Sequence, residues 1–344
     1  MATIYKGSDS DLFFLSERLR AGELVAVPTE TVYGLAANAL DAGACRRIFE
    51  AKERPAHDPL IVHVANRQAA ENIAVFNEAA SLLAIRFWPG PLSLVLPKKP
   101  AIPDILTSGR PTVAVRVPAH PLMHALLERC RLPLAAPSAN PFGYVSPTTV
   151  EHVQHGLGER IKYILDGGPC AVGVESTIVD ARDADDPVIL RPGGLAREAI
   201  EQALGRPVRV HAGSTQQSRA SRAPEDPAGE LAPGMLDRHY SPRTPVVLRK
   251  RPFTPEELEN APPGVARVCI QKPTTLAARS AGRLERIFWL SESGDIDEAA
   301  RRLFALMREL DATGFARIEF EPAPSSALGL AINDRLRRAA APAP

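Results

Sequence analysis

The first 205 residues alternate between the two hydrophobic periods that are typical of helices and strands. Leucines recur at helical spacing over residues 12–19, after a Ser8 or Asp9 cap and before Gly22, which predicts a helix. Other amphipathic runs predict helices at 41–52, at 78–87 and before Gly205, and apolar runs predict strands at 24–27, 60–64, 91–97, 112–117 and 189–191. Strands that alternate with helices indicate an α/β domain.

Residues 206–243 depart from this pattern. They are polar and rich in Pro, Ser and Ala, which is the composition of a linker. The segment nevertheless ends in PGMLDRHYSP, which contains four apolar or aromatic side chains that a passive spacer does not need. These are Met235, Leu236, His239 and Tyr240. We therefore predict a linker at 208–243 that separates a domain at 1–207 from one at 244–344.

The second domain repeats the alternation on a smaller scale. Strands are predicted at 245–249, 265–271, 286–290 and 317–322, and helices at 255–260, within 272–285, at 295–313 and at 325–338. Short connections between alternating strands and helices favour a small parallel, Rossmann-like sheet. No group of side chains in this domain indicates chemistry. Four of its basic residues are expected on the solvated surface: Arg317, Arg335, Arg337 and Arg338.

Composition narrows the class of protein further. The chain has 344 residues, 45% of them hydrophobic, which is enough for two cores. Its 41 basic and 40 acidic residues nearly cancel, so any nucleic-acid contact must come from a local patch. The four cysteines lack CxxC spacing, which argues against a zinc site and fits reduced thiols. Because the sequence has no signal-like or membrane-spanning run, we expect a soluble, cytoplasmic protein.

Residues 52–63, KERPAHDPLIVH, hold the densest group of candidate chemical side chains. Lys52 and Arg54 stand at a helix end, where Pro55 prevents the helix from continuing. In the strand that follows, His63 shares a face with Ile61. Two cations beside a chain reversal suit a ligand with several phosphates, although a solvated pair at a helix C-terminus would look the same.

Hydroxyl and arginine side chains recur at the predicted strands. The turn at 28–34 is rich in threonine, which fits either a ligand site or a helix cap. Thr112 and Arg116 share one face of their strand, as an anion site or a cross-strand ion pair requires. Arg191 ends a strand before a glycine turn and a helix, an arrangement that binds anions without being a Walker or dinucleotide motif.

Two further segments carry small polar side chains. The loop at 136–147 offers Ser138, Asn140 and Ser146 to phosphate, sugar or base, or it simply connects two elements. At 173–180, GVESTIVD, a glycine precedes Glu175 and Ser176 at the start of a strand.

Six stretches, in this order, resemble the YrdC-like family of threonylcarbamoyl-AMP synthases. They are PTETVYGLAANA, KERPAHDPLIVHV, TVAVRVPAHP, APSANPFGYVSPTT, GVESTIVD and ILRPGG. The linker and the second domain resemble the long, two-domain form of the family. This resemblance implies a large twisted sheet, mixed or mostly parallel, with an open, positively charged concave site. Tyr144 and Asp58 depart from residues that are common in the family.

The resemblance also implies an activity. L-threonine, bicarbonate and ATP with Mg²⁺ would give threonylcarbamoyladenylate and pyrophosphate, and a separate transferase complex would pass the group to tRNA beside the anticodon. Threonine would be bound by Thr31, His63, Arg116, Ala136 and Ser176. ATP would be bound by Lys52, Arg54, Asp58, Thr112, Ser138, Asn140, Ser146, Arg191, His239 and Tyr240. Lys52 and Arg54 would act in catalysis by neutralising charge, and no metal ligands are assigned.

Two other functions remain open at this point. A carbamoyltransferase could contain a related domain, although such chains add zinc-finger modules with CxxC pairs, which this chain lacks. A double-stranded RNA or tRNA-binding module without catalysis is the second alternative, and weak tRNA contact is compatible with the synthase as well. We also predict that PGMLDRHYSP folds over the nucleotide site as a lid, or else docks the linker against one domain.

Overall fold

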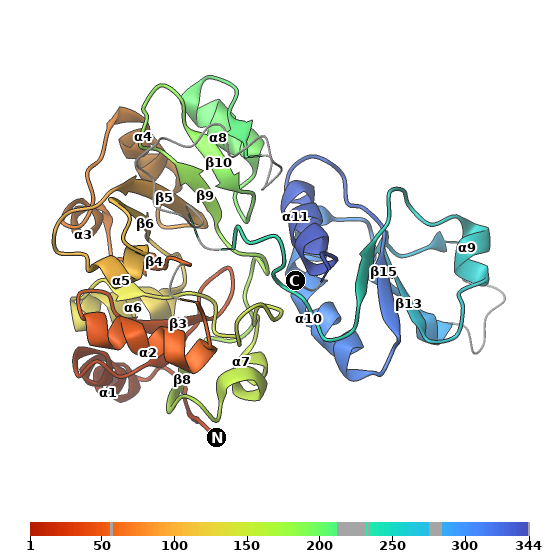
Figure 1. Ribbon diagram of the computed structural model, residues 1–344, viewed down its shortest axis with the longest axis horizontal. Helices are drawn as coiled ribbons and strands as arrows, with labels where there is room; N and C mark the ends of the chain where they lie inside the picture. Colours follow the sequence, from red (N-terminus) through yellow and green to blue (C-terminus); the bar gives the residue numbers. More distant parts are fainter. Residues whose placement is uncertain (56–57, 212–231, 233, 275–283, 343–344) are drawn as a thin grey trace.

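The computed structural model describes residues 1–55, 58–211, 232, 234–274 and 284–342 of the 344-residue chain. They form two α/β units that lie side by side (Figure 1). The helix predicted within 272–285 falls mostly on residues 275–283, outside the described residues. The domain boundaries at 207 and 244 stay predictions, because most of the linker between them also lies outside this part of the chain.

The first unit contains eight of the described helices and eleven of the described strands. The helices are α1 (Asp9–Arg20), α2 (Ala42–Lys52), α3 (Arg67–Glu71), α4 (Glu78–Phe87), α5 (Asp104–Thr107), α6 (Pro121–Cys130), α7 (Val150–Leu157) and α8 (Arg197–Leu204). The strands are β1 (Thr3–Tyr5), β2 (Val25–Val27), β3 (Gly34–Asn38), β4 (Ile61–His63), β5 (Leu92–Pro97), β6 (Thr112–Arg116), β7 (Leu134–Ala135), β8 (Tyr163–Leu165), β9 (Thr177–Asp180), β10 (Val188–Arg191) and β11 (Arg209–Val210).

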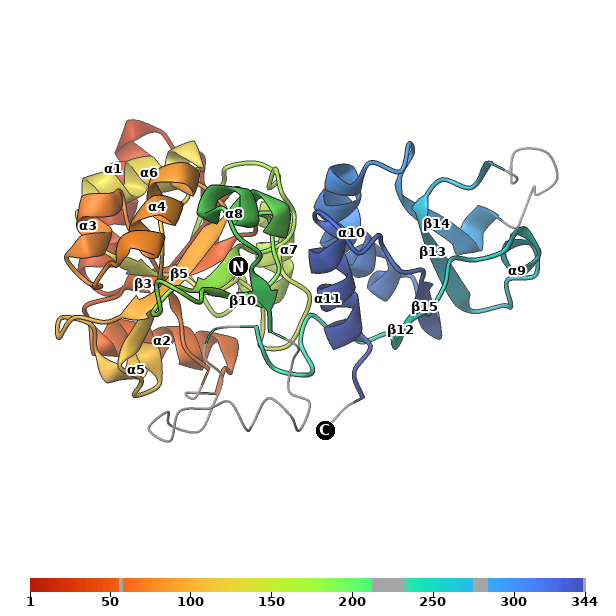
Figure 2. The same cartoon turned by 90° about the horizontal axis from the view of Figure 1, so that it is seen from above.

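The second unit is smaller. Its helices are α9 (Pro255–Glu259), α10 (Ile296–Ala312) and α11 (Gly329–Ala339), with a 3₁₀ turn η3 (Leu284–Arg286), and its strands are β12 (Val246–Leu248), β13 (Val265–Gln271), β14 (Ile287–Ser291) and β15 (Arg317–Phe320). The strand order is β12-β15-β13-β14, and every pair is parallel, which confirms the predicted parallel sheet. Helices α10 and α11 lie between this sheet and the first unit (Figure 2).

The large sheet is evenly mixed. Its order is β1-β8-β2-β3-β7-β4-β6-β5-β9-β10-β11. Among the described strands, five neighbouring pairs are parallel and five are antiparallel. The mixed sheet is confirmed, and a mostly parallel sheet is wrong for this chain. The turn between β2 and β3 is one reason, because so short a connection can join only antiparallel neighbours.

The predicted caps of two helices are confirmed in detail. Ser8 accepts a hydrogen bond from the backbone N–H of Asp11 at the start of α1, and Asp41 caps α2 in the same way. The predicted strand faces are also confirmed, since Val113, Val115 and Val117 pack in the main core. Arg116 therefore points to the opposite face of β6, where the site lies.

Two arginines near the C-terminus contradict their prediction. Arg335 is 0% exposed and Arg338 is 9% exposed, so their assignment to the solvated surface is wrong. Both lie on α11 where that helix faces the first unit, and contacts with carboxylates and backbone carbonyls replace water around their charges. Arg317 and Arg337 do lie on the surface, with side chains 48% and 70% exposed.

Apolar and polar contacts join the two units. Val145 of the first unit belongs to the same buried cluster as Phe304 of the second. Tyr144 donates from its hydroxyl to Asp311 at 2.7 Å, and the Arg308 guanidinium lies 4.9 Å from the centre of the Tyr144 ring. The departure from the family pattern at Tyr144 therefore falls on a contact between the units. None of the described helices is long and apolar enough to cross a membrane.

Candidate active site

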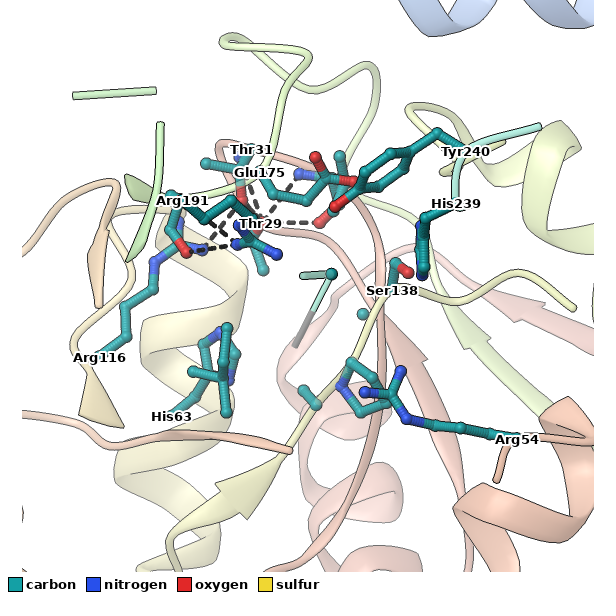
Figure 3. A pocket seen from close by; sticks show the side chains of 17 residues that line it. Thr29, Thr31, Arg54, His63, Arg116, Ser138, Glu175, Arg191, His239 and Tyr240 are labelled. Carbon is teal, nitrogen blue, oxygen red and sulfur yellow. Dashed lines mark hydrogen bonds between the residues drawn. The ribbon is translucent and has the colours of Figure 1, made fainter. Parts of the chain in front are cut away.

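The middle strands of the large sheet bring the first site residues together. His63 of β4 and Arg116 of β6 are register partners in neighbouring parallel strands. Ala136 follows β7, and its backbone N–H donates to the carbonyl of Ile61 at 3.0 Å. Because Ile61, His63 and Arg116 share one face of the sheet, all three line the same cavity (Figure 3).

The cavity has about 510 Å³ of empty space, including its mouth. It is lined by Thr29, Thr31, Val32, Gly34, Arg54, Ile61, His63, Arg116, Ala136, Pro137, Ser138, Glu175, Ser176, Arg191, Gly234, His239 and Tyr240. Figure 3 shows Arg116 and His63 on one side and Arg54 and His239 on the other, with Ser138 between them. The cavity thus separates Arg116 of β6 from Arg54, which lies in the loop after α2.

Arg116 is held from three directions. Its Nε donates to the Gly90 carbonyl at 3.1 Å, and Nη1 donates to Thr31 Oγ1 at 2.9 Å. Its Nη2 lies 2.7 Å from Glu30 Oε1. These contacts orient the planar guanidinium toward the cavity, where it can bind a carboxylate through two parallel hydrogen bonds.

The threonine-rich segment forms a turn and not a helix cap. It connects β2 to β3, and no helix begins in it. The Oγ1 atoms of Thr29 and Thr31 lie 2.8 Å apart, and Thr29 also donates to the Val32 carbonyl at 2.6 Å. The turn therefore positions Thr31 beside Arg116.

The cations of the 52–63 segment are buried rather than solvated. Lys52 Nζ donates to the carbonyls of Ser138 and Asn140, at 2.5 Å each. Burial and the nearby Arg54 charge lower the pKa of Lys52 well below its ordinary value. Arg54 lines the cavity and pairs with Asp58 at 2.9 Å. Lys52 thus holds the 136–147 loop through its backbone carbonyls, and Arg54 reaches the cavity itself.

The 136–147 loop is a built part of the site. Ser138 lines the cavity, and a backbone bridge connects it to Gly34. The Asn140 side chain donates to carbonyls of its own loop. Ser146 Oγ donates to Glu175 Oε1 at 2.5 Å. The last two side chains therefore shape the loop and do not line the cavity.

The residues just before β9 and the end of β10 supply the next wall. Ser176 Oγ lies 2.8 Å from Ser93 Oγ. The Nη2 of Arg191 donates to the Ser176 carbonyl at 2.9 Å. Glu175 belongs to this wall, and its carboxylate accepts from Arg335 Nε of α11 at 2.7 Å.

The end of the linker closes the site. His239 is 5% exposed and Tyr240 is 1% exposed, and both line the cavity. The His239 ring meets Phe142 edge-on at 6.0 Å, and the Tyr240 ring stacks on Phe304 of α10 at 5.7 Å. Gly234 has a positive φ of 74°, and a side chain there would lie 2.4 Å from the Tyr240 hydroxyl, which explains the glycine.

Ten of the fifteen predicted site residues line this cavity: Thr31, Arg54, His63, Arg116, Ala136, Ser138, Ser176, Arg191, His239 and Tyr240. The other five do not line it. Four of them contact residues around the cavity: Lys52, Asp58, Asn140 and Ser146. Thr112 lies at the far end of β6 from Arg116.

The structure adds three residues to the site or its surroundings that the sequence did not assign to it: Thr29, Glu175 and Arg335. A carboxylate at a strand start after glycine was the only signal for Glu175.

His63 is buried as a neutral imidazole. Burial, followed by the Arg116 charge, lowers the pKa of His63 to about 3. An unfolded histidine titrates near pH 6.5, so the unfolded chain binds the proton first and stability falls as the pH decreases from 6.5 toward 3. At pH 5 the resulting loss in the free energy of unfolding is about 2 kcal/mol.

Replacing His63 with glutamine removes the group that titrates. We therefore expect the drop in Tm between pH 7 and pH 5 to be smaller for His63→Gln than for the native protein. Equal drops in Tm would contradict this prediction.

Comparison with known proteins agrees with this geometry. A family model described as "Telomere recombination" matches residues 17–193, and one described as "Threonylcarbamoyl-AMP synthase, C-terminal domain" matches residues 195–341. A threonylcarbamoyl-AMP synthase from Pyrococcus abyssi is 43% identical, over 93% of this chain and 91% of the relative. One from Bacillus subtilis is 41% identical, over 94% and 90%.

Solved structures extend the likeness to three dimensions. The crystal structure of P. abyssi Sua5 complexed with L-threonine superposes with a TM-score of 0.83 at 39% identity, covering 99% of this chain and 97% of that one. A P. abyssi Sua5 variant in which a histidine and a tyrosine are replaced by alanine superposes equally well, at 38% identity over 99% and 96%. On these grounds the chain belongs to the threonylcarbamoyl-AMP synthase family, in its two-domain Sua5 form.

Proposed function

We propose that this protein joins L-threonine, bicarbonate and ATP into threonylcarbamoyl-AMP and releases pyrophosphate. Its curated relatives carry the name of that activity, and the P. abyssi structure contains L-threonine. One observation carries the proposal furthest. A single cavity has Arg116 on one side and Arg54 on the other, so an amino-acid carboxylate and a polyphosphate can be held next to each other.

The threonine end is proposed around Arg116. Its guanidinium would bind the substrate carboxylate as a bidentate pair. Thr31 and His63 would contact the rest of the amino acid, and the Ala136 backbone and Ser176 would complete this end. The neutral His63 can accept or donate one hydrogen bond without repelling the threonine ammonium group.

The ATP end is proposed around Arg54 and Arg191. Their charges would neutralise the phosphates, and Lys52 would support them through the loop that it holds. Ser138, His239 and Tyr240, which line the cavity, are the other proposed ATP contacts. Asp58, Asn140 and Ser146 would act through the residues that they hold around the cavity, and an ATP contact of Thr112 stays a prediction. Mg²⁺ would enter with the phosphates of ATP, since the described residues contain no group of three or more potential metal ligands and Mg²⁺ commonly binds through substrate phosphates and water.

The chemistry requires positioning more than a nucleophilic side chain. The threonine nitrogen loses a proton and attacks bicarbonate, which forms a carbamate with loss of water. A carbamate oxygen then attacks the α-phosphorus of ATP, the bond to the β-phosphate oxygen breaks, and pyrophosphate leaves. Arg54 and Arg191 would stabilise the charge that develops on the leaving group, and Lys52 would contribute through the loop that it holds.

The product is an activated threonylcarbamoyl group, which a group-transfer reaction must consume. We propose that a separate transferase complex transfers this group to tRNA beside the anticodon. Direct contact of this protein with tRNA would be weak, because the net charge is +1. We propose that the protein carries out this role in the cytoplasm.

The purified protein is expected to release pyrophosphate only when ATP, bicarbonate and L-threonine are all present with Mg²⁺. Omitting each component in turn supplies the controls, and mass spectrometry of the product identifies the adenylate. L-serine should be less effective by about 1–3 kcal/mol in kcat/KM, because it lacks the methyl group that a fitted pocket contacts. Equal turnover with any amino acid, or none with threonine, would contradict the proposal.

A further inference from the structure

Arg335 connects the C-terminal helix α11 to the wall of the cavity. Its Nε donates to Glu175 Oε2 at 2.7 Å, and its Nη1 donates to the Pro192 carbonyl at 3.0 Å and to Asp334 Oδ2 at 2.6 Å. Its guanidinium lies 4.9 Å from the centre of the Tyr240 ring. Arg335 is 0% exposed. An arginine of the second unit therefore contacts Glu175 and Tyr240, two residues that line the cavity of the first.

The two units have other contacts that hold them together. Val32, Val145 and Val174 of the first unit pack into the same buried cluster as Phe304. Compared with apolar groups of the same volume, a buried ion pair adds little net stability. The Arg335–Glu175 pair lies in the cavity wall. This position indicates a role in the site, in addition to holding the two units together.

Glu175 has an unusual position for a carboxylate. It lies in a cavity where Arg54 and Arg191 are expected to meet phosphates. Burial alone raises the pKa of Glu175, but the Arg335 and Arg191 charges and the hydrogen bond from Ser146 outweigh burial and hold its pKa below the ordinary value. Without Arg335, this negative charge would be only partly neutralised and would repel the phosphates.

We propose that Arg335 is a positioning residue for ATP, which acts by neutralising Glu175 in the wall of the nucleotide site. Glu175 can then hold the 136–147 loop through Ser146 without adding net negative charge to the nucleotide site. This inference rests on the proposed adenylate-forming function. It gives the second unit a direct part in nucleotide binding.

The test is a double-mutant cycle in the full chain with Arg335→Gln, Glu175→Gln and the double variant. ATP affinity is measured by calorimetry, which does not require turnover, and pyrophosphate release separates KM from kcat. Arg335→Gln is expected to weaken ATP binding about tenfold or more, the scale expected when a buried charge loses its partner. In the Glu175→Gln background the same change should have almost no effect, because the charge in the cavity wall is gone and Asp334 keeps its pair with Arg338.

Arg337→Gln is the matched control. Arg337 lies on the same helix with its side chain 70% exposed, so this variant should bind ATP normally. Additive losses in the double variant, or normal ATP binding by Arg335→Gln, would overturn the inference. If Arg335→Gln does not fold, the comparison of Glu175→Gln with the double variant decides alone. A native protein that fails to make the adenylate would instead contradict the proposed function.

Discussion

Replacing Arg116 with alanine is expected to weaken L-threonine binding by about 2–5 kcal/mol and to leave ATP affinity almost unchanged. The side chain is 4% exposed, so its contact with a substrate carboxylate would be shielded from water. Removing it also leaves Glu30, 2.7 Å away, without its cation in a nearly buried place. That carboxylate would then repel the carboxylate of threonine, which adds to the loss.

Calorimetric titrations with threonine and with ATP measure the two affinities separately. Arg86→Ala is a suitable control, because this arginine lies exposed in the last turn of α4. Lys52→Ala and Arg54→Ala should have the opposite selectivity and weaken ATP binding and turnover. If all three site variants lost ATP affinity alone, the assignment of Arg116 to the threonine carboxylate would be wrong.

Strand patterns predicted the residues of the site that lie on regular elements. Arg116 and His63 point into the cavity because the valines that alternate with them on β6 and β4 fill the core. The same alternation could not predict β3, because the first four residues of its GLAAN sequence are all apolar and show no period of two. Helix α6 is absent from the predictions as well, although its buried positions recur at helical spacing: Met123, Leu126, Leu127 and Cys130.

Contacts between the two units could not be predicted in this way. Arg335 has a local signal, since it lies three residues after Ile332 and four before Ala339 on the buried face of α11. A charge on such a face requires a partner, but nothing in the sequence of α11 identifies that partner. Glu175 lies 160 residues away in the chain, and only the packing of the two units brings the pair together.

The PGMLDRHYSP segment is proposed to act as a lid over the nucleotide. His239 faces Arg54 and Lys52, and burial followed by these charges lowers the pKa of His239 well below its ordinary value. The Tyr240 hydroxyl is buried and has no hydrogen-bond partner among the described residues. An imidazole that stays neutral and a hydroxyl without a partner are both available to a bound ligand.

The segment also contacts the second unit. Arg338 of α11 donates to the carbonyls of Met235 and Leu236, at 2.7 and 2.6 Å. The Tyr240 ring stacks on Phe304. The lid and a purely structural docking segment therefore predict different results for the same variants.

The double variant His239→Ala with Tyr240→Ala is expected to bind ATP about tenfold more weakly, or about 1.4 kcal/mol, and to consume more ATP for each adenylate recovered. The reason is that closure excludes water from a product that hydrolyses easily. Tyr240→Phe is the matched control, since it keeps the ring on Phe304 and removes only the hydroxyl. It should melt at the native temperature and lose only the share of ATP affinity that the hydroxyl supplies. If the double variant melts earlier but keeps native ATP affinity and native yield of adenylate, the segment is a structural clasp and the lid is wrong.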